Sequence, residues 1–298
     1  MLLYETHRAI NGGPVVAARE GADQREANLS RLLAECVPVS ADELGAADRQ
    51  KTAQRIATGI GLAVFVPKGD FDSVMKCGHL YSQRELLRLR LRKAPDTETL
   101  TSETVLGTAD DVFTYAGPCR YLSARTGVAI GVGLLFRWEI ELERSEDAVA
   151  TPFDSGAVFK FLRPNDPPEE QVAFVHRHEL PIPQYRRLLE HYLVACFREP
   201  PDYVRGIDPI CWPIPVQGGD ARRWTFEVRF QKRLSINHRL LAVLIPKAMA
   251  AEPLIMAQTA RWRAMGVELP PPFSGARRPL SRQLAAETVQ YWLKHLGV

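Results

Sequence analysis

The chain has 298 residues, of which 46% are hydrophobic and 24% are charged. This composition excludes a collagen, a mostly disordered protein and a coiled-coil rod, and it gives enough length to bury a sizeable core. Lys and Arg total 38 against 35 Asp and Glu, and this formal net charge of +3 is too small to require a nucleic-acid partner.

The five cysteines are scattered, and no two of them form a C-x-x-C pair. This pattern argues against a disulfide framework and against a structural zinc site. Residues 1–8 show no basic segment leading into an apolar one, as a secretory signal would require. The longest apolar run, residues 127–136, has about half the length of a membrane helix. We therefore expect a cytoplasmic protein with free thiols and no membrane partner.

The first 60 residues predict an N-terminal helical segment. In residues 17–35, leucines recur at helical spacing among charged residues. A second helix is predicted over residues 40–58, because Ser40 and Glu43 have the spacing of a capping box. Gly59 and Gly61 should end that helix.

The remaining residues predict strands scattered among helices. Strands are expected over residues 62–67, 113–115, 128–135, 136–142, 224–230 and 240–245. Helices are expected over residues 70–77 (with Gly78 after its end), 183–197 and 281–295. Residues 83–92 fit either a helix or a strand, whereas residues 94–110, 145–150, 163–170 and 199–219 are predicted as loops or irregular segments. Because strands and helices do not alternate regularly, this order predicts an α+β core over residues 61–250. A C-terminal helical segment is predicted over residues 251–298.

Three short segments carry candidate chemistry, whereas glycine-rich phosphate loops and the G-x-S-x-G motif are absent from the sequence. His176 and His178 would share one face of a strand and could hold a metal with His191 or Asp154, or they are solvated loop histidines. Residues 151–156 have turn chemistry, and Asp154 and Ser155 within them could also line a pocket.

The third segment, residues 224–230, alternates apolar and polar residues, as a strand with two different faces does. Alternation places Thr225, Glu227 and Arg229 on one face and aromatic or aliphatic residues on the other. That face is either a solvated cross-strand surface or the border of a cleft. In a cleft, the Glu227 carboxylate would stabilise a developing positive charge and Arg229 would hold a phosphate.

Residues 224–247, WTFEVRFQKRLSINHRLLAVLIPK, resemble the closing strand pair of ADP-ribosyltransferases, in which one strand carries the catalytic Glu. Residues 65–82, ending in GHLYS, are similar in layout to the N-terminal NAD-binding part of the DNA-targeting toxin branch. Residues 112–118, VFTYAGP, resemble the aromatic segment that follows in that branch.

The resemblance implies a split sheet, mixed or antiparallel, with flanking helices and a cleft that binds NAD as a substrate. Glu227 would be catalytic, and the NAD cleft would be lined by Tyr81, Ser82, Tyr115 and Arg229. The basic stretch with Arg84, Arg88 and Arg92 would hold a nucleic-acid or protein acceptor.

The chain departs from this family in its first strand, which normally supplies an Arg or His to NAD. Here the matching residues are Val64, Phe65 and Val66. Lys68, His79 or Arg84 would then have to replace the missing side chain.

Two further functions are compatible with the sequence. A non-catalytic nucleic-acid or protein interaction module would use the basic stretch of residues 84–93 and the arginines beside Trp262, whose ring could stack on bases. A metal-dependent hydrolase would use His176 and His178.

Overall fold

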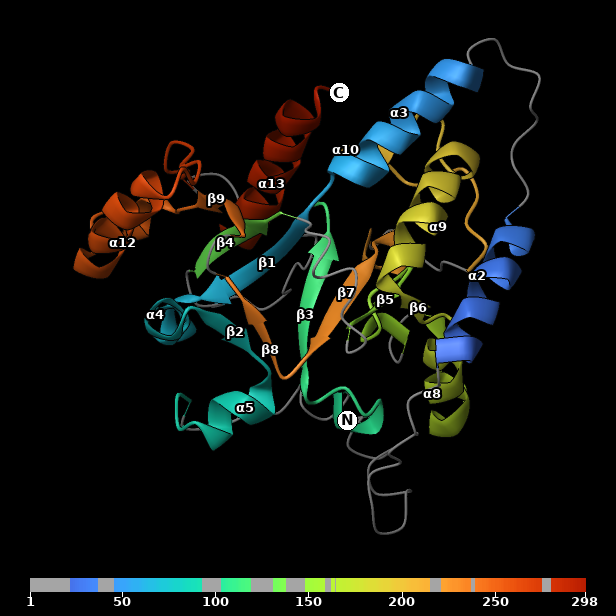
Figure 1. Ribbon diagram of the computed structural model, residues 1–298, viewed down its shortest axis with the longest axis horizontal. Helices are drawn as coiled ribbons and strands as arrows, with labels where there is room; N and C mark the ends of the chain where they lie inside the picture. Colours follow the sequence, from blue (N-terminus) through green and yellow to red (C-terminus); the bar gives the residue numbers. More distant parts are fainter. Residues whose placement is uncertain are drawn as a thin grey trace.

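The computed structural model describes residues 22–36, 46–92, 103–118, 131–137, 148–158, 162–163, 165–214, 221–236, 239–274 and 280–298. Its centre is a seven-stranded sheet with the order β6-β5-β7-β3-β1-β4-β9 (Figure 1). The strands are β1 (Leu62–Pro67), β3 (Asp111–Ala116), β4 (Gly131–Phe136), β5 (Ala148–Thr151), β6 (Leu180–Pro181), β7 (Glu227–Gln231) and β9 (Leu240–Leu244). Each neighbouring pair of these strands is antiparallel.

A second, two-stranded sheet branches from the end of β7. It pairs β2 (His79–Tyr81) with β8 (Arg233–Ser235). Lys232 separates β7 from β8 and has a φ of 62°, a left-handed conformation that turns the chain. The protein is therefore an α+β protein with a split sheet, as the sequence predicted.

Helices flank both ends of the sheet (Figure 1). The longer ones are α2 (Ala22–Glu35), α3 (Ala46–Gly59), α4 (Lys68–Cys77), α8 (Pro168–His176), α9 (Ile182–Ala195), α12 (Pro253–Ala264) and α13 (Leu280–Leu296). The shorter ones are α5 (Gln83–Arg88), α10 (Asp202–Arg205), α11 (Lys247–Ala250) and the 3-10 helix η2 (Ala221–Trp224). In Figure 1, α2, α3 and α9 lie beside the β5–β6 end, and α12 and α13 lie beside β4 and β9.

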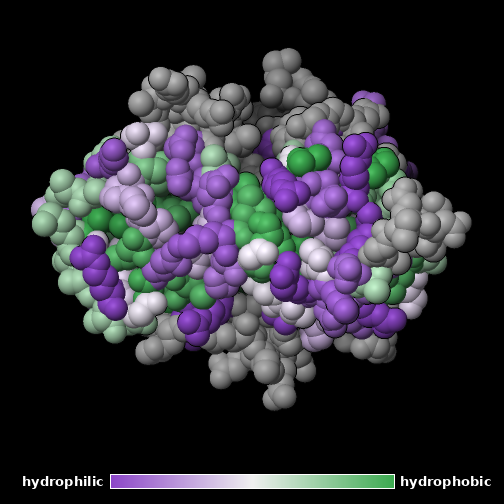
Figure 2. Space-filling view, turned by 90° about the horizontal axis from the view of Figure 1, so that it is seen from above, coloured by the Kyte–Doolittle hydropathy of each residue, from purple (hydrophilic) through white to green (hydrophobic). Residues whose placement is uncertain are grey.

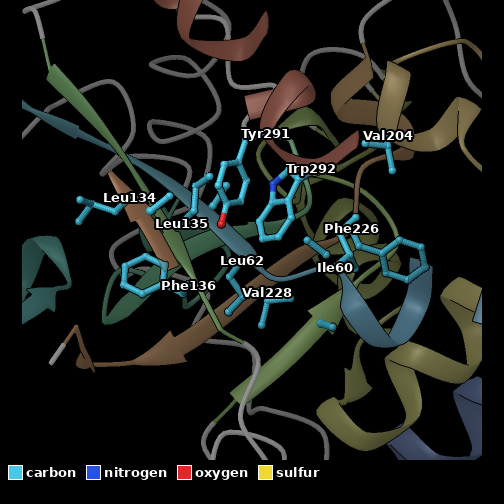
Figure 3. Close-up of a cluster of buried hydrophobic side chains, with 14 of the residues drawn as sticks. Ile60, Leu62, Leu134, Leu135, Phe136, Val204, Phe226, Val228, Tyr291 and Trp292 are labelled. Atoms are coloured by element: carbon cyan, nitrogen blue, oxygen red, sulfur yellow. The ribbon is translucent and has the colours of Figure 1, made fainter. Parts of the chain in front are cut away.

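One hydrophobic core joins all three parts of the chain (Figure 3). Leu32 and Ile56 from the N-terminal helices, Val228 from β7 and Trp292 from α13 belong to the same cluster of buried side chains. Trp292 also donates a hydrogen bond from Nε1 to the Gly117 carbonyl oxygen, at 2.8 Å. The N-terminal and C-terminal helical segments thus pack on the α+β core rather than standing apart from it.

Several elements follow directly from local sequence signals. Gly78 ends α4 with a φ of 65°, which a glycine adopts without strain. Ser82 begins α5, and its Oγ accepts a hydrogen bond from the Glu85 backbone N–H at 3.2 Å. This cap resolves the ambiguous residues 83–92 in favour of a short helix.

Other sequence predictions are wrong or lie outside the described residues. Residues 148–150, predicted as part of a loop, form most of β5 and are completely buried between β6 and β7. The predicted loop over residues 163–170 runs into α8, which begins at Pro168. The predicted cap at Ser40 and the predicted strand residues 138–142 fall outside the described residues.

Gly61 lies where β1 begins, and replacing it with Ala should destabilise the fold. A Cβ atom there would lie 2.0 Å from the Phe136 carbonyl oxygen and 2.7 Å from Trp292 Cη2. Both obstacles are buried in the core, so the strand or the helix would have to shift. We expect the free energy of unfolding of Gly61→Ala to fall by roughly 3 kcal/mol, measured by urea denaturation.

Gly69, on the exposed surface of α4, is the matched control because nothing lies within 4 Å of an added Cβ. Gly69→Ala should leave stability unchanged or raise it by up to about 1 kcal/mol, since alanine favours a helix more than glycine does. Equal effects of the two substitutions would contradict the steric argument.

Candidate functional site

Strand β7 lies between β3 and β5 and places Glu227 and Arg229 on one face of the sheet. Tyr115 on β3 and Thr151 on β5 both pair with Glu227, and Phe113 pairs with Arg229. Residues in register on neighbouring antiparallel strands share a face. The alternation predicted for this strand is thus confirmed for Glu227 and Arg229. Both side chains are buried, so this part of the face is not a solvated surface.

The Glu227 carboxyl has few polar partners for a group that is 1% exposed. Its Oε2 accepts a hydrogen bond from the Ser155 backbone N–H at 3.3 Å, and its Oε1 lies 3.4 Å from Arg229 Nε. Removal from water, followed by repulsion from Asp154, raises the pKa of Glu227 to about 8 against the attraction of Arg229. At neutral pH the carboxyl is therefore mostly protonated.

Arg229 is completely enclosed and faces three carboxyl groups. Its Nη2 donates to Glu179 Oε1 at 2.5 Å, and its Nη1 lies 3.8 Å from Asp111 Oδ2. The third group is Glu227. One guanidinium cannot neutralise three carboxylates, which is a further reason for Glu227 to keep its proton.

Glu179 is the carboxylate that Arg229 binds most closely. Its Oε2 also lies 3.3 Å from His176 Nδ1. Burial alone would raise the pKa of Glu179, but the charge of Arg229, followed by the hydrogen bond with His176, lowers it to about 2. From α2, Asn28 Nδ2 donates to the carbonyl oxygens of His176 and Glu179, at 3.2 and 3.0 Å. The N-terminal helix thereby fixes the backbone that carries Glu179.

Tyr115 and the turn after β5 complete the group around Glu227. The Tyr115 hydroxyl donates to Asp154 Oδ2 at 3.0 Å, and both residues are buried. Asp154 and Ser155 lie in the turn that the sequence predicted for residues 151–156. The structure therefore brings together the predicted residues Glu227, Tyr115 and Arg229 with Asp154 and Ser155.

Tyr81 and Ser82 lie at the other end of the β3–β7 pair. Tyr81 pairs with Arg233 on β8, and the Ser82 backbone N–H donates to the Lys232 carbonyl oxygen at 2.9 Å. Along β7, Gln231 lies four residue steps of about 3.4 Å each from Glu227, and Lys232 follows Gln231. Tyr81 and Ser82 are thus not brought to Glu227, and their contact with NAD stays a prediction.

The three arginines predicted to bind an acceptor each have an acidic neighbour. Arg88 Nη2 lies 2.7 Å from Glu85 Oε2, Arg84 Nη1 lies 3.6 Å from Asp110 Oδ2, and Arg92 is bonded to Asp70. These pairs reduce the positive charge that the segment offers to a polyanion. The candidate replacements for the first-strand Arg or His also have partners, since Lys68 pairs with Glu252 and His79 Nδ1 contacts the Cys77 carbonyl oxygen.

His176 and His178 do not form the strand pair that a shared metal would need. His176 ends α8, and His178 follows it in a turn. The His178 ring packs on Phe174 and Phe153, and its Nδ1 contacts the Phe174 carbonyl oxygen at 2.6 Å. Burial lowers the pKa of His178 to about 4. Among the described residues, no group of three or more His, Cys, Asp or Glu side chains is placed to hold a metal ion.

Reasoning from the sequence misses three residues of this group: Glu179, Asp111 and Asn28. Glu179 directly follows the histidine pair, and Asp111 lies at the boundary between a predicted loop and a predicted strand. Neither position has a local pattern that marks it as a partner of β7. The available signal is Arg229 on β7 itself, because a buried guanidinium requires acidic partners and the segment supplies only Glu227.

In the part of the chain that the structure describes, no helix is long and apolar enough to cross a membrane. In the view of Figure 2, hydrophobic residues are interspersed among hydrophilic ones. No protein-family model and no curated protein matches the sequence.

Proposed function

We propose that the protein is an NAD-dependent ADP-ribosyltransferase that modifies a nucleic-acid or protein acceptor, with Glu227 as its catalytic carboxylate. The observation that supports this proposal best is the buried Glu227 on β7, whose pKa is raised by burial and by the nearby Asp154. A carboxyl with a raised pKa is typical of acid–base and electrostatic catalysis at glycosidic bonds.

The reaction breaks the bond between the nicotinamide nitrogen and C1′ of its ribose. The bonding electron pair leaves with nicotinamide, and C1′ becomes part of a positively charged oxocarbenium-like group. A carboxylate beside that charge lowers the barrier most when water is excluded. The acceptor nucleophile then forms a bond to C1′ and gives up a proton.

Glu227 suits this role because its pKa of about 8 lies close to neutral pH, so that a nearby cation can shift the carboxyl to its ionised form. The approach of the positively charged nicotinamide ring favours the ionised carboxyl, so that binding of NAD releases the proton. Asp154 accepts a hydrogen bond from the Tyr115 hydroxyl. It is the second carboxyl group beside Glu227 and can take the proton that the acceptor gives up.

The turn of residues 152–156 lies against Glu227. The Ser155 backbone N–H donates to Glu227, and the carboxyl is 1% exposed. Because the carboxyl is buried, the side of the site formed by this turn would have to open for NAD to reach it. Gly156, exposed beside Ser155, gives the turn conformational freedom at this point.

The test is nicotinamide release from NAD by the wild-type protein and by Glu227→Gln, each with and without DNA, RNA or a cell lysate. Because Gln resembles the protonated carboxyl but cannot ionise, we expect release to fall by at least about tenfold. The additive that stimulates release identifies the acceptor class.

Glu170→Gln is the matched control, since Glu170 is an exposed carboxylate on α8. It should release nicotinamide at the wild-type rate. If the wild-type protein releases no nicotinamide with any additive, the proposed ADP-ribosyltransferase activity is wrong. Binding of DNA or RNA that weakens steeply with salt would then support the interaction module.

A further inference from the structure

Two cysteines that are far apart in the sequence meet at the ends of two helices. Cys36 follows the last residue of α2, and Cys196 follows the last residue of α9. Their sulfur atoms are 3.2 Å apart, and the side chains are 4% and 0% exposed. A disulfide has an S–S distance of about 2.05 Å, so the two sulfurs need to approach by only about 1 Å.

We propose that Cys36 and Cys196 form a reversible disulfide under oxidising conditions and that this bond fastens α2 to α9. The reaction requires an oxidant of the peroxide class or a small disulfide. The proposal concerns the state of two thiols and does not depend on the activity proposed for Glu227.

The surroundings make Cys36 the attacking thiol. Its contact with Cys196 and the nearby His191 stabilise the thiolate and lower the pKa of Cys36. The same contact, together with burial, raises the pKa of Cys196. His191 Nε2 lies 3.2 Å from the Cys36 carbonyl oxygen, which places the imidazole beside this residue.

With hydrogen peroxide, the reaction balances in two steps. The Cys36 thiolate attacks one peroxide oxygen, the O–O bond breaks, and hydroxide leaves, which gives a sulfenic acid. The sulfur of Cys196 then attacks the sulfur of Cys36, the S–O bond breaks, and water forms with the proton of Cys196. The proton that Cys36 gave up on forming the thiolate converts the hydroxide to water. Two electrons thus pass from the two thiols to peroxide, which ends as two water molecules.

Cys211 is a competitor, because it also interacts with Cys196 and raises its pKa. Its Sγ donates to the Ala195 carbonyl oxygen at 3.3 Å, whereas Cys36 Sγ contacts Cys196 Sγ directly. A bond between Cys36 and Cys196 closes a loop of about 160 residues, and long loops restrict the unfolded chain most. The disulfide would also hold α2 in place. Asn28 on this helix donates hydrogen bonds to the carbonyl oxygens of His176 and Glu179.

The test is treatment of the folded, reduced protein with hydrogen peroxide, followed by alkylation, proteolysis without reductant and mass spectrometry. We expect a Cys36–Cys196 cross-linked peptide that is lost after dithiothreitol. The oxidised protein should melt roughly 5 °C higher than the reduced one. Amide hydrogen exchange in residues 22–36 should be slower after oxidation.

Cys211→Ser should retain the cross-link, and Cys196→Ser should lose it together with the shift in melting temperature. Circular dichroism before treatment verifies that each variant is folded. The wild-type protein decides the question even if Cys196→Ser does not fold. An oxidised wild-type protein with both thiols alkylated, or with Cys196 joined to Cys211 instead, would overturn the proposal.

Discussion

Replacing Arg229 with Met should cost the protein roughly 3–5 kcal/mol of its free energy of unfolding. The guanidinium is fully buried and lies within ion-pair distance of Glu179, Glu227 and Asp111. Its removal leaves Glu179 as a buried carboxylate without the charge that lowers its pKa. A buried charge without a counterion is much more costly than the loss of an exposed pair. Urea denaturation at neutral pH measures the change.

A second variant separates the loss of charge from the loss of packing. Arg229→Met combined with Glu179→Gln removes both partners of the 2.5 Å pair and should recover a large part of the lost stability. Arg205→Met is the surface control, because Arg205 is 40% exposed in its pair with Asp202 and should cost under about 1 kcal/mol. A loss at Arg229 as small as that at Arg205 would show that the buried network does not stabilise the fold.

The same network shows how far the sequence predicts this site. Alternation along residues 224–230 correctly places Glu227 and Arg229 on one face, because a strand turns each successive side chain to the opposite side. Alternation cannot say which residues cover that face. Glu179 reaches Arg229 only because β6 pairs with β5 and β5 pairs with β7, and such long-range pairing has no local signal.

The fold shows a similar division between local and long-range signals. Helix α9, strand β1 and the Gly78 cap follow from periodicity and glycine conformation, and the structure contains all three. Strand β5 is not predicted because Ala148, Val149 and Ala150 form a run too short to separate from a loop. Its strand character comes from the two neighbours that hydrogen-bond to it.

The stability of the wild-type protein should fall relative to that of Glu227→Gln as the pH rises from about 5 to 8. In the unfolded chain this carboxyl ionises near the ordinary glutamate pKa of 4.5, whereas burial raises the pKa of the folded Glu227 to about 8. Between these values the folded state binds one more proton than the unfolded state, so that a rise in pH favours unfolding. The shift corresponds to a relative loss on the order of 4 kcal/mol, measured by urea denaturation at half-unit pH steps.

The direction of this change distinguishes Glu227 from Glu179 on the same network. The pKa of Glu179 is lowered to about 2, so its contribution is complete above the ordinary glutamate pKa and is lost as the pH falls toward 2. The titration of Glu179 should thus lower the stability of the wild-type protein in acid, and the titration of Glu227 should lower it above about pH 5. A difference between wild type and Glu227→Gln that stays constant from about pH 5 to 8 would mean that Glu227 is already ionised in the folded protein. The carboxyl would then be a fixed partner of Arg229 and would have no proton to release when a cation approaches.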